Sequence, residues 1–121
     1  MRLRLLPLPV LGVAGWLVSG AAIAQNGPFD NETTAELARL CASPVATERD
    51  FCFGFMLGAG QFYTEMLRAG VIRPLACPDP VPTIEEMRLG FIDWVAANPE
   101  AGETRAVDGM MQAAADAWPC N

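Results

Sequence analysis

The chain has 121 residues, fourteen acidic and eight basic side chains, and neither histidine nor lysine. Without histidine, neither nucleophile-histidine catalysis nor a histidine metal site can be built, so we expect no enzyme activity, no metal and no cofactor. Without lysine and with only scattered arginines, the chain also lacks the clustered positive charge with which proteins bind nucleic acid.

The first 24 residues have the order of a secretory signal peptide. Arg2 and Arg4 precede a charge-free apolar run from Leu5 to Ile23, which closes with the small-residue pattern Ala22-Ile23-Ala24. We predict cleavage after Ala24 and a periplasmic mature chain of residues 25–121, a single domain with net charge -8 and no membrane association. An uncleaved membrane anchor is the alternative, but the prolines and glycines of this run make a poor spanning helix.

The mature chain begins with two predicted helices. Thr33-Thr34-Ala35-Glu36 has the form of a capping box and predicts a short helix over about residues 34–42, which Ser43-Pro44 ends. Thr47 with Asp50 is the expected cap of a long second helix, which ends at Ala69-Gly70. Its expected buried stripe follows helical spacing: Phe51, Cys52, Phe55, Met56, Ala59, Phe62, Tyr63, Met66 and Leu67.

Gly54 and Gly58 lie within this second helix and weaken it, since glycine is a poor helix former. We expect them to be packing residues, on a face where the missing side chains let another backbone approach. A glycine-rich phosphate cradle is the alternative, but no strand precedes the glycines and no lysine follows them.

A proline-rich connection follows, because Arg73-Pro74, Cys77-Pro78, Asp79-Pro80 and Val81-Pro82 cannot lie inside a helix. Thr83-Ile84-Glu85-Glu86 is a second capping box and predicts a third helix, with a buried stripe that ends before Asn98-Pro99. Asn98 is the expected cap of a fourth helix, which runs to Trp118-Pro119-Cys120. No segment alternates as a strand would. The buried stripe of the third helix is Ile84, Met87, Phe91, Trp94 and Val95, and that of the fourth is Val107, Met110, Met111 and Ala114.

The predicted fold is therefore all-α, a small four-helix up-down bundle stapled by two disulfides. Four cysteines in an exported chain, Cys41, Cys52, Cys77 and Cys120, form no C-x-x-C pair that would indicate zinc or redox chemistry. An up-down order favours Cys41 with Cys52 and Cys77 with Cys120, while the other two connectivities stay open.

Paired acids are the remaining catalytic candidates. Glu85 with Glu86, or Glu100 with Glu103, could in principle act as a general acid and base. Acids at helix starts are equally explained by capping and by the helix dipole, so we expect no catalytic residue here.

Five short motifs together resemble the Rap1a/Tai family, the amidase immunity proteins of type VI secretion. They are Leu40-Cys41, the run Phe51-Cys52-Phe53-Gly54-Phe55-Met56-Leu57-Gly58, Cys77-Pro78, Asn98-Pro99-Glu100 and Ala117-Trp118-Pro119-Cys120. The resemblance covers the mature chain, although Phe55 replaces a usual tyrosine. It implies a periplasmic helical protein, often a homodimer, that binds a peptidoglycan amidase effector and covers its active-site cleft to prevent self-intoxication.

The resemblance identifies no inhibitory residue, so contact candidates come from the two turns. Arg73 and Asp79 in the proline-rich segment, and Glu100 and Glu103 in the Asn98 to Thr104 turn, are exposed candidates for a cleft, and solvated loop residues are the alternative for each. Two other function classes stay open. A small periplasmic chaperone or stress protein would use the Met- and Phe-rich second helix, and a structural helical dimer would use its glycine face without any toxin partner.

Overall fold

The computed structural model describes residues 32–121, so the predicted signal peptide, its cleavage site and residues 25–31 lie outside the described part. Over this part the chain forms four α-helices, one 3-10 helix and no strand. The elements are α1 (Thr34–Ala42), α2 (Ala46–Arg68), α3 (Ile84–Ala97), η1 (Pro99–Glu103) and α4 (Ala106–Ala117). Among these helices, none is both long enough and apolar enough to cross a membrane.

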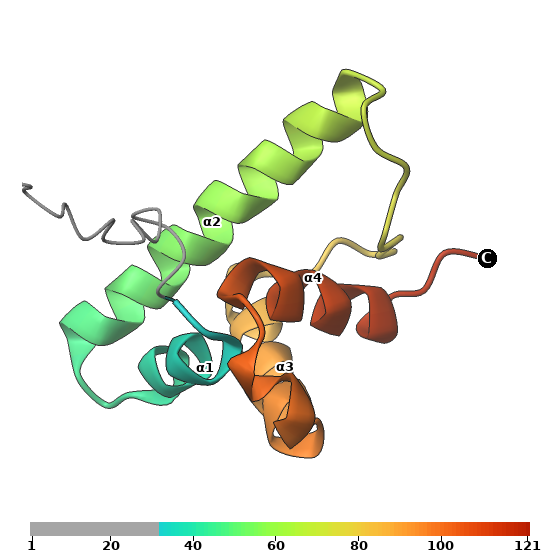
Figure 1. The fold of residues 1–121 in the computed structure, drawn as a ribbon. Helices are drawn as coiled ribbons and strands as arrows, with labels where there is room; N and C mark the ends of the chain where they lie inside the picture. The colour runs from blue at the N-terminus through green and yellow to red at the C-terminus, as the bar shows by residue number, and fades with distance from the viewer. Residues whose placement is uncertain (1–31) are drawn as a thin grey trace, which may run out of the picture.

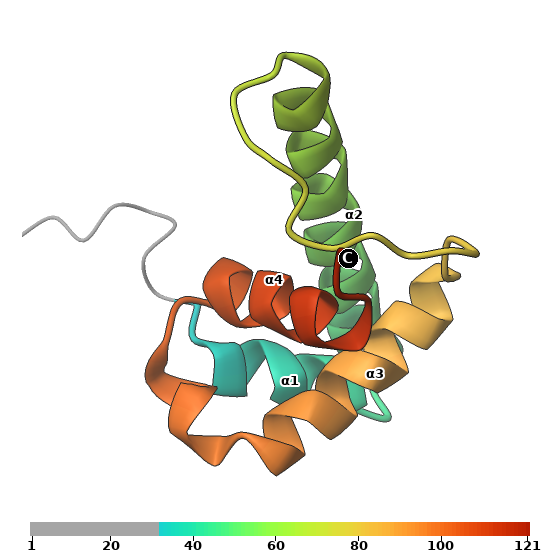
Figure 2. The same cartoon turned by 90° about the vertical axis from the view of Figure 1, so that its right-hand side faces the viewer.

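The predicted all-α fold with two disulfides is confirmed, and both pairs are those favoured by the up-down order. Cys41 is joined to Cys52 and Cys77 to Cys120, with Cα atoms 5.1 and 5.0 Å apart. The helices α1, α3 and α4 form one group, and α1 contacts every other helix. The long α2 lies against this group with its first half, and its second half extends beyond it (Figures 1 and 2).

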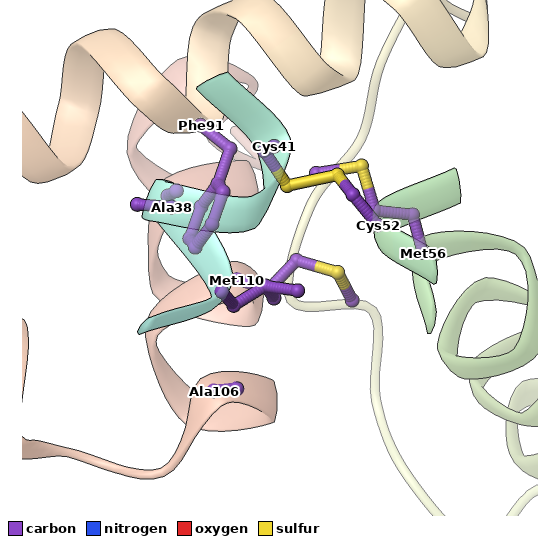
Figure 3. Packing of buried hydrophobic residues seen from close by; sticks show 9 residues of the cluster. Ala38, Cys41, Cys52, Met56, Phe91, Ala106 and Met110 are labelled. Carbon is purple, nitrogen blue, oxygen red and sulfur yellow. A yellow bond between two sulfur atoms is a disulfide. The ribbon is translucent and has the colours of Figure 1, made fainter. Parts of the chain in front are cut away.

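The core is small and sits where α1 meets the start of α2 and the middle of α3 and α4 (Figure 3). Leu37, Cys41 and Cys52 are fully buried, and Met56 is 1% exposed. Phe91 and Met110 cover them from α3 and α4. The first disulfide is therefore part of the hydrophobic core, and it fixes the corner between α1 and α2.

The start of α1 is tied to the start of α4 by hydrogen bonds. Thr34 N–H donates to the Thr104 carbonyl over 2.8 Å, and Ala106 N–H donates to the Glu32 carbonyl over 2.9 Å. The Thr34 hydroxyl is fully buried and finds its partners at Thr104 and Arg105. Burying a polar group costs little free energy when its hydrogen bonds are formed. This contact can therefore hold α4 close to α1.

Gly109 permits that close approach. A Cβ atom at Gly109 would overlap the side chain of Thr34, so only glycine fits there. The predicted packing glycines, Gly54 and Gly58, have no such role within the described chain: both are exposed, and a Cβ at either would meet no atom within 4 Å. Close helix packing through glycine is present, but it lies in α4, where the predicted stripe did not single out Gly109.

Two helix starts match the predictions and two differ from them. Thr33 caps α1 through Glu36 N–H, and Thr83 with Glu86 forms the predicted capping box of α3. The second helix starts at Ala46 with no side-chain cap, so Thr47 lies inside its first turn and is not the cap. Asn98 and Pro99 open the 3-10 helix η1, and α4 begins only at Ala106, because the chain turns at Thr104 to meet Thr34.

The predicted stripe of α2 was too wide. Cys52 and Met56 are buried as expected, but Phe51 and Phe62 are 48% and 67% exposed. Both phenylalanines lie at the edge of a stripe counted in steps of three and four residues, and among residues 32–121 no helix covers the second half of α2. In α4, Val107 is likewise 37% exposed, whereas Met110 is buried.

Candidate partner-binding surface

The segment between α2 and α3 begins at a glycine turn. Gly70 has φ of 67°, the left-handed conformation that glycine adopts without strain. Gly70 N–H donates to the Leu67 carbonyl and Val71 N–H to the Met66 carbonyl, each over 3.0 Å. These two bonds form a Schellman motif, which satisfies the last carbonyls of α2 and turns the chain back along the helix.

The returning loop, residues 71–82, is held at three points. The Leu75 N–H donates to the Tyr63 hydroxyl oxygen over 2.7 Å, and the Cys77 N–H donates to the Trp118 carbonyl over 2.8 Å. The disulfide from Cys77 to Cys120 then ties the loop to the C-terminus. Four prolines, at positions 74, 78, 80 and 82, fix backbone φ angles on both sides of these anchors. The loop therefore has a defined shape although it contains no regular structure.

An apolar cavity of about 220 Å³ lies beneath this loop. Tyr63 from α2, Leu75 from the loop, and Met110 and Trp118 at the other side contribute to its lining. The cavity shows that the loop stands partly clear of the helices and is held by its contacts at Leu75 and Cys77 instead of by a packed core below.

The outermost part of the loop carries an apolar side chain. Val81 is 82% exposed, the highest value among the exposed large hydrophobic side chains, and it stands between Pro80 and Pro82. Asp79, one of the predicted contact residues, is exposed in the same turn. In Figure 2 this turn forms the right-hand edge of the molecule, next to the start of α3. An exposed hydrophobic residue beside a carboxylate, on a loop of fixed shape, is suited to entering a cleft in another protein.

The structure separates the four predicted contact residues into two pairs. Arg73 and Asp79 lie in the loop 71–82, whereas Glu100 and Glu103 lie in η1 at the opposite end of the molecule (Figures 1 and 2). All four are exposed. One compact contact surface cannot include both pairs.

Sequence reasoning missed Val81. The sequence does contain a pattern that predicts its exposure. An apolar residue between two prolines cannot lie inside a helix, so its side chain cannot belong to the buried face of one.

A second surface feature is a cleft of about 710 Å³ between the second half of α2 and the start of α3. Leu57, Gly60 and Phe62 contribute to its wall on α2, and Ile84 and Met87 to its floor on α3. It exists because α2 leaves the helix group at an angle. Gly54, Gly58 and Gly60 on this helix cost roughly 1 kcal/mol each relative to alanine, and no neighbour within the described chain requires their small size.

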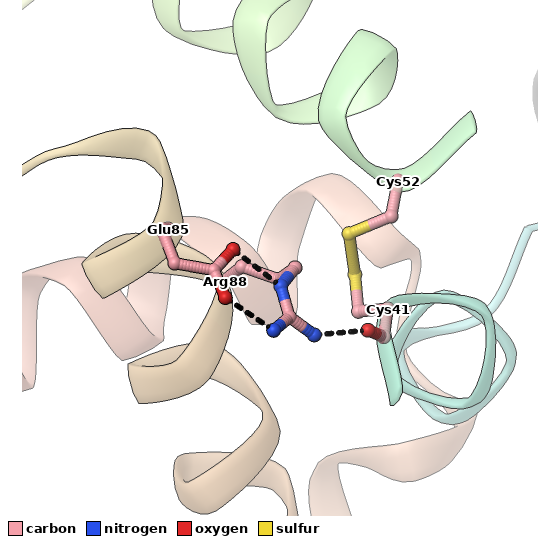
Figure 4. Close-up of a disulfide and its surroundings, with 4 residues drawn as sticks. All are labelled: Cys41, Cys52, Glu85 and Arg88. Atoms are coloured by element: carbon pink, nitrogen blue, oxygen red, sulfur yellow. Dashed lines mark hydrogen bonds and ion pairs between the residues drawn. A yellow bond between two sulfur atoms is a disulfide. The ribbon is translucent and has the colours of Figure 1, made fainter. Parts of the chain in front are cut away.

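On the first half of α3, Arg88 joins this helix to the end of α1. Its guanidinium donates to the Cys41 carbonyl at the end of α1 and forms two bonds with Glu85, over 2.6 and 2.8 Å (Figure 4). It also lies 5.9 Å from the centre of the Phe53 ring. The Arg88 hydrogen bonds hold the pKa of Glu85 below its ordinary value. This arrangement caps α1 and supports the buried disulfide, so its role is structural.

Among the described residues, no three acidic or cysteine side chains come together in a way that could hold a metal ion. Glu86 caps α3 through its bonds with Thr83, as predicted, whereas Glu85 forms an ion pair with Arg88.

The comparison with known families matches residues 33–120 to Rap1a immunity proteins. The chain belongs to the Rap1a immunity protein family. The match begins at the cap of α1 and ends at Cys120, so it includes all four helices and both disulfides. No curated protein and no solved structure matches the chain. Membership of the Rap1a family makes a protein effector the expected partner, and the resemblance noted from the sequence is confirmed.

Proposed function

We propose that this Rap1a family member is a periplasmic immunity protein of a type VI secretion system. It binds a peptidoglycan amidase effector, covers the active-site cleft of that enzyme and protects the producing cell and its kin. The observation that carries the proposal is the family match across the entire helical unit. Two disulfides and a leader of the secretory type agree with an oxidising compartment outside the cytoplasm.

The loop 71–82 is the part of the molecule that we assign to the effector cleft. Its anchors at Tyr63 and Trp118 and its disulfide fix its shape before binding, which lowers the entropy lost on association. Val81 supplies an apolar contact and Asp79 a charged one. The net negative charge of the chain favours a basic surface around the cleft.

The test is expression in the periplasm together with candidate cell-wall amidases from the same organism, scored by rescue from lysis and by co-purification. We expect one amidase to be neutralised and to form a stable complex. Val81→Asp should abolish both effects, while Leu89→Asp, the same change at a 48% exposed site on α3, should leave them intact. The double variant Glu100→Ala with Glu103→Ala tests whether η1 contacts the effector instead of the loop 71–82.

Two results would overturn the proposal. Failure to rescue against every candidate amidase, combined with suppression of aggregation of unrelated proteins, would favour a chaperone. Loss of binding in the Glu100 and Glu103 variant, with Val81→Asp unaffected, would move the contact surface to η1.

A further inference from the structure

The apolar cavity of about 220 Å³ beneath the loop 71–82 differs in its lining from the larger cleft between α2 and α3. Its walls come from the second half of α2, from the loop, from α3 and α4, and from Trp118. None of the described residues that line it is charged, whereas Glu65 and Arg68 line the cleft. A charged ligand would lose its hydration in the cavity without gaining an ion pair. The lining therefore excludes ions and favours an uncharged, apolar molecule.

The cavity also offers water few hydrogen-bond partners. Among the lining residues that the structure describes, only Tyr63 and Thr64 carry hydroxyl groups. The Thr64 hydroxyl already donates to the Gly60 carbonyl, over 2.9 Å. Because a buried water is held by roughly two to four polar partners, an apolar molecule displaces water from this space readily.

The size of the cavity and the sulfur atoms in its lining favour an aromatic ligand. Cavities of roughly 150 Å³ with apolar walls bind benzene, so this one has room for a second fused ring. Met87, Met110 and Met111 line it from α3 and α4, and Trp118 adds an indole ring. Thioethers adapt their shape and make favourable contacts with aromatic rings, and two aromatic rings attract each other through faces and edges. A flat molecule of one or two rings therefore matches this lining.

The Tyr63 hydroxyl supplies one polar contact. Its oxygen accepts the Leu75 N–H over 2.7 Å, and both residues line the cavity. Within residues 32–121 the proton of this hydroxyl has no acceptor. A hydroxyl that accepts one hydrogen bond becomes a stronger donor, so Tyr63 is suited to donate to an acceptor atom of a ligand.

We propose that this cavity is a binding site for a small, uncharged aromatic molecule of one or two rings that carries one hydrogen-bond acceptor. The rings lie among the three methionines and Trp118, and the acceptor atom receives the Tyr63 proton. The loop 71–82 forms one wall of the site, on its way from the end of α2 to the start of α3 (Figure 2). The ligand thus supplies packing that the loop lacks. Val81 is not among the lining residues, so the site is separate from the surface assigned to the effector.

The experiment uses the mature chain with both disulfides intact and two probes of nearly equal shape, quinoline and naphthalene. Quinoline has a ring nitrogen that accepts a hydrogen bond, and naphthalene has none. Nitrogen–proton correlation NMR follows the two indole N–H signals of residues 25–121, which belong to Trp94 and Trp118. We expect both probes to bind with dissociation constants on the order of 0.1 mM and to shift the Trp118 signal. The Trp94 signal should stay in place, because its indole N–H is bonded to Asp116 away from the cavity.

Tyr63→Phe tests the polar contact. The variant should weaken the binding of quinoline by about fivefold relative to that of naphthalene, since only quinoline loses a hydrogen bond. Loss of the bond to Leu75 affects both probes alike. The ratio of the two dissociation constants therefore isolates the contact between Tyr63 and the ring nitrogen.

Ala114→Phe tests the location of the site, because it places a ring in the cavity from α4. It should remove the binding of both probes. Gln112→Phe is the matched control, since Gln112 is exposed on the same helix and does not line the cavity. Circular dichroism confirms that each variant is folded.

A Trp118 signal that neither probe shifts at concentrations near their solubility would overturn the proposal. So would shifts that persist in Ala114→Phe, or equal weakening of both probes by Tyr63→Phe. None of these measurements involves the effector, so their failure is distinct from failure of the proposed immunity function.

Discussion

The two disulfides hold two very different regions. Cys41 and Cys52 are fully buried in the core, whereas Cys77 and Cys120 are exposed and hold a surface loop to the C-terminus. From chain entropy alone, separations of 11 and 43 residues give about 3 and 4 kcal/mol, which ranks the exposed bridge higher. Burial reverses this ranking for the stability of the fold, because only the Cys41–Cys52 bridge is part of the hydrophobic core. The second one fixes the shape of a loop.

Truncation of the core should have the largest effect. Leu37→Ala removes a fully buried side chain between α1 and its neighbours and should lower the free energy of unfolding by about 3 kcal/mol. Val81→Ala in the exposed loop should change it by less than about 0.5 kcal/mol. Urea denaturation measures both. Equal losses would show that the loop belongs to the core.

Reduction under native conditions should distinguish the two bridges directly. The exposed Cys77 to Cys120 bond is open to a thiol reagent, while the Cys41 to Cys52 bond must wait for a local opening of the core. We expect the exposed bond to be reduced at least about 100-fold faster, corresponding to an opening free energy near 3 kcal/mol. Timed alkylation with peptide mass spectrometry gives the order. Simultaneous loss of both bonds would contradict the separation into two regions.

Replacing a glycine by alanine should lower the free energy of unfolding in the packed helix α4 and raise it in the uncovered part of α2. Gly109→Ala forces a methyl group into Thr34 and should cost about 2 kcal/mol. Gly60→Ala in α2 has open space and should gain up to about 1 kcal/mol from better helix propensity. Thermal or urea unfolding measures the sign. A loss at Gly60 would indicate a close neighbour there that the described chain does not contain.

The loss of stability on removing an arginine should also differ between the packed helix α3 and the projecting part of α2. Arg88→Ala removes the bond to the Cys41 carbonyl and the Glu85 pair at a side chain only 12% exposed, so we expect a loss of about 1.5 kcal/mol. Arg68→Ala breaks an exposed pair on the projecting part of α2 and should cost less than about 0.5 kcal/mol. Urea denaturation measures both values.

The smallest effect concerns acid pH. Hydrogen bonds from the Thr83 backbone and hydroxyl lower the pKa of Glu86 below its ordinary value of 4.5. Because the folded pKa is the lower one, the contribution of Glu86 to stability is present above pH 4.5 and is lost as pH falls through the folded pKa. Glu86→Gln should therefore be less stable than the original protein at neutral pH, and the difference should shrink as the pH falls below 4.5. A difference independent of pH would exclude this linkage.

The sequence predicted the parts of the fold that depend on local chemistry. The cap at Thr33, the capping box at Thr83 and the stop at Ser43-Pro44 each involve residues only a few positions apart and need no tertiary information. The prediction that Asn98 caps the fourth helix was wrong. The start of α4 depends on the contact between Thr104 and Thr34, about seventy residues apart in the chain. Helical spacing likewise cannot show that the second half of α2 is left uncovered by the other described helices.

The candidate surface was predictable only in part. Proline spacing located the loop that carries Arg73 and Asp79, and an even cysteine count predicted its anchor. The separation of this loop from Glu100 and Glu103 depends on the packing of α3 against α1 and α4, which residue spacing does not encode. Val81 was not predicted, because an apolar residue carries no charge that would mark it as an exposed contact.

The two disulfides also divide the backbone into two covalent rings that do not overlap, residues 41–52 and residues 77–120. Cleavage after Arg88 or Arg105 opens the larger ring but leaves its pieces joined, whereas cleavage after Arg68 separates the chain into two fragments. Residues 53–76 are thus the single tether between the rings, and most of that tether is α2. A mechanical load applied to the larger ring therefore reaches the ring of residues 41–52, along the covalent chain, only through the backbone of this one helix.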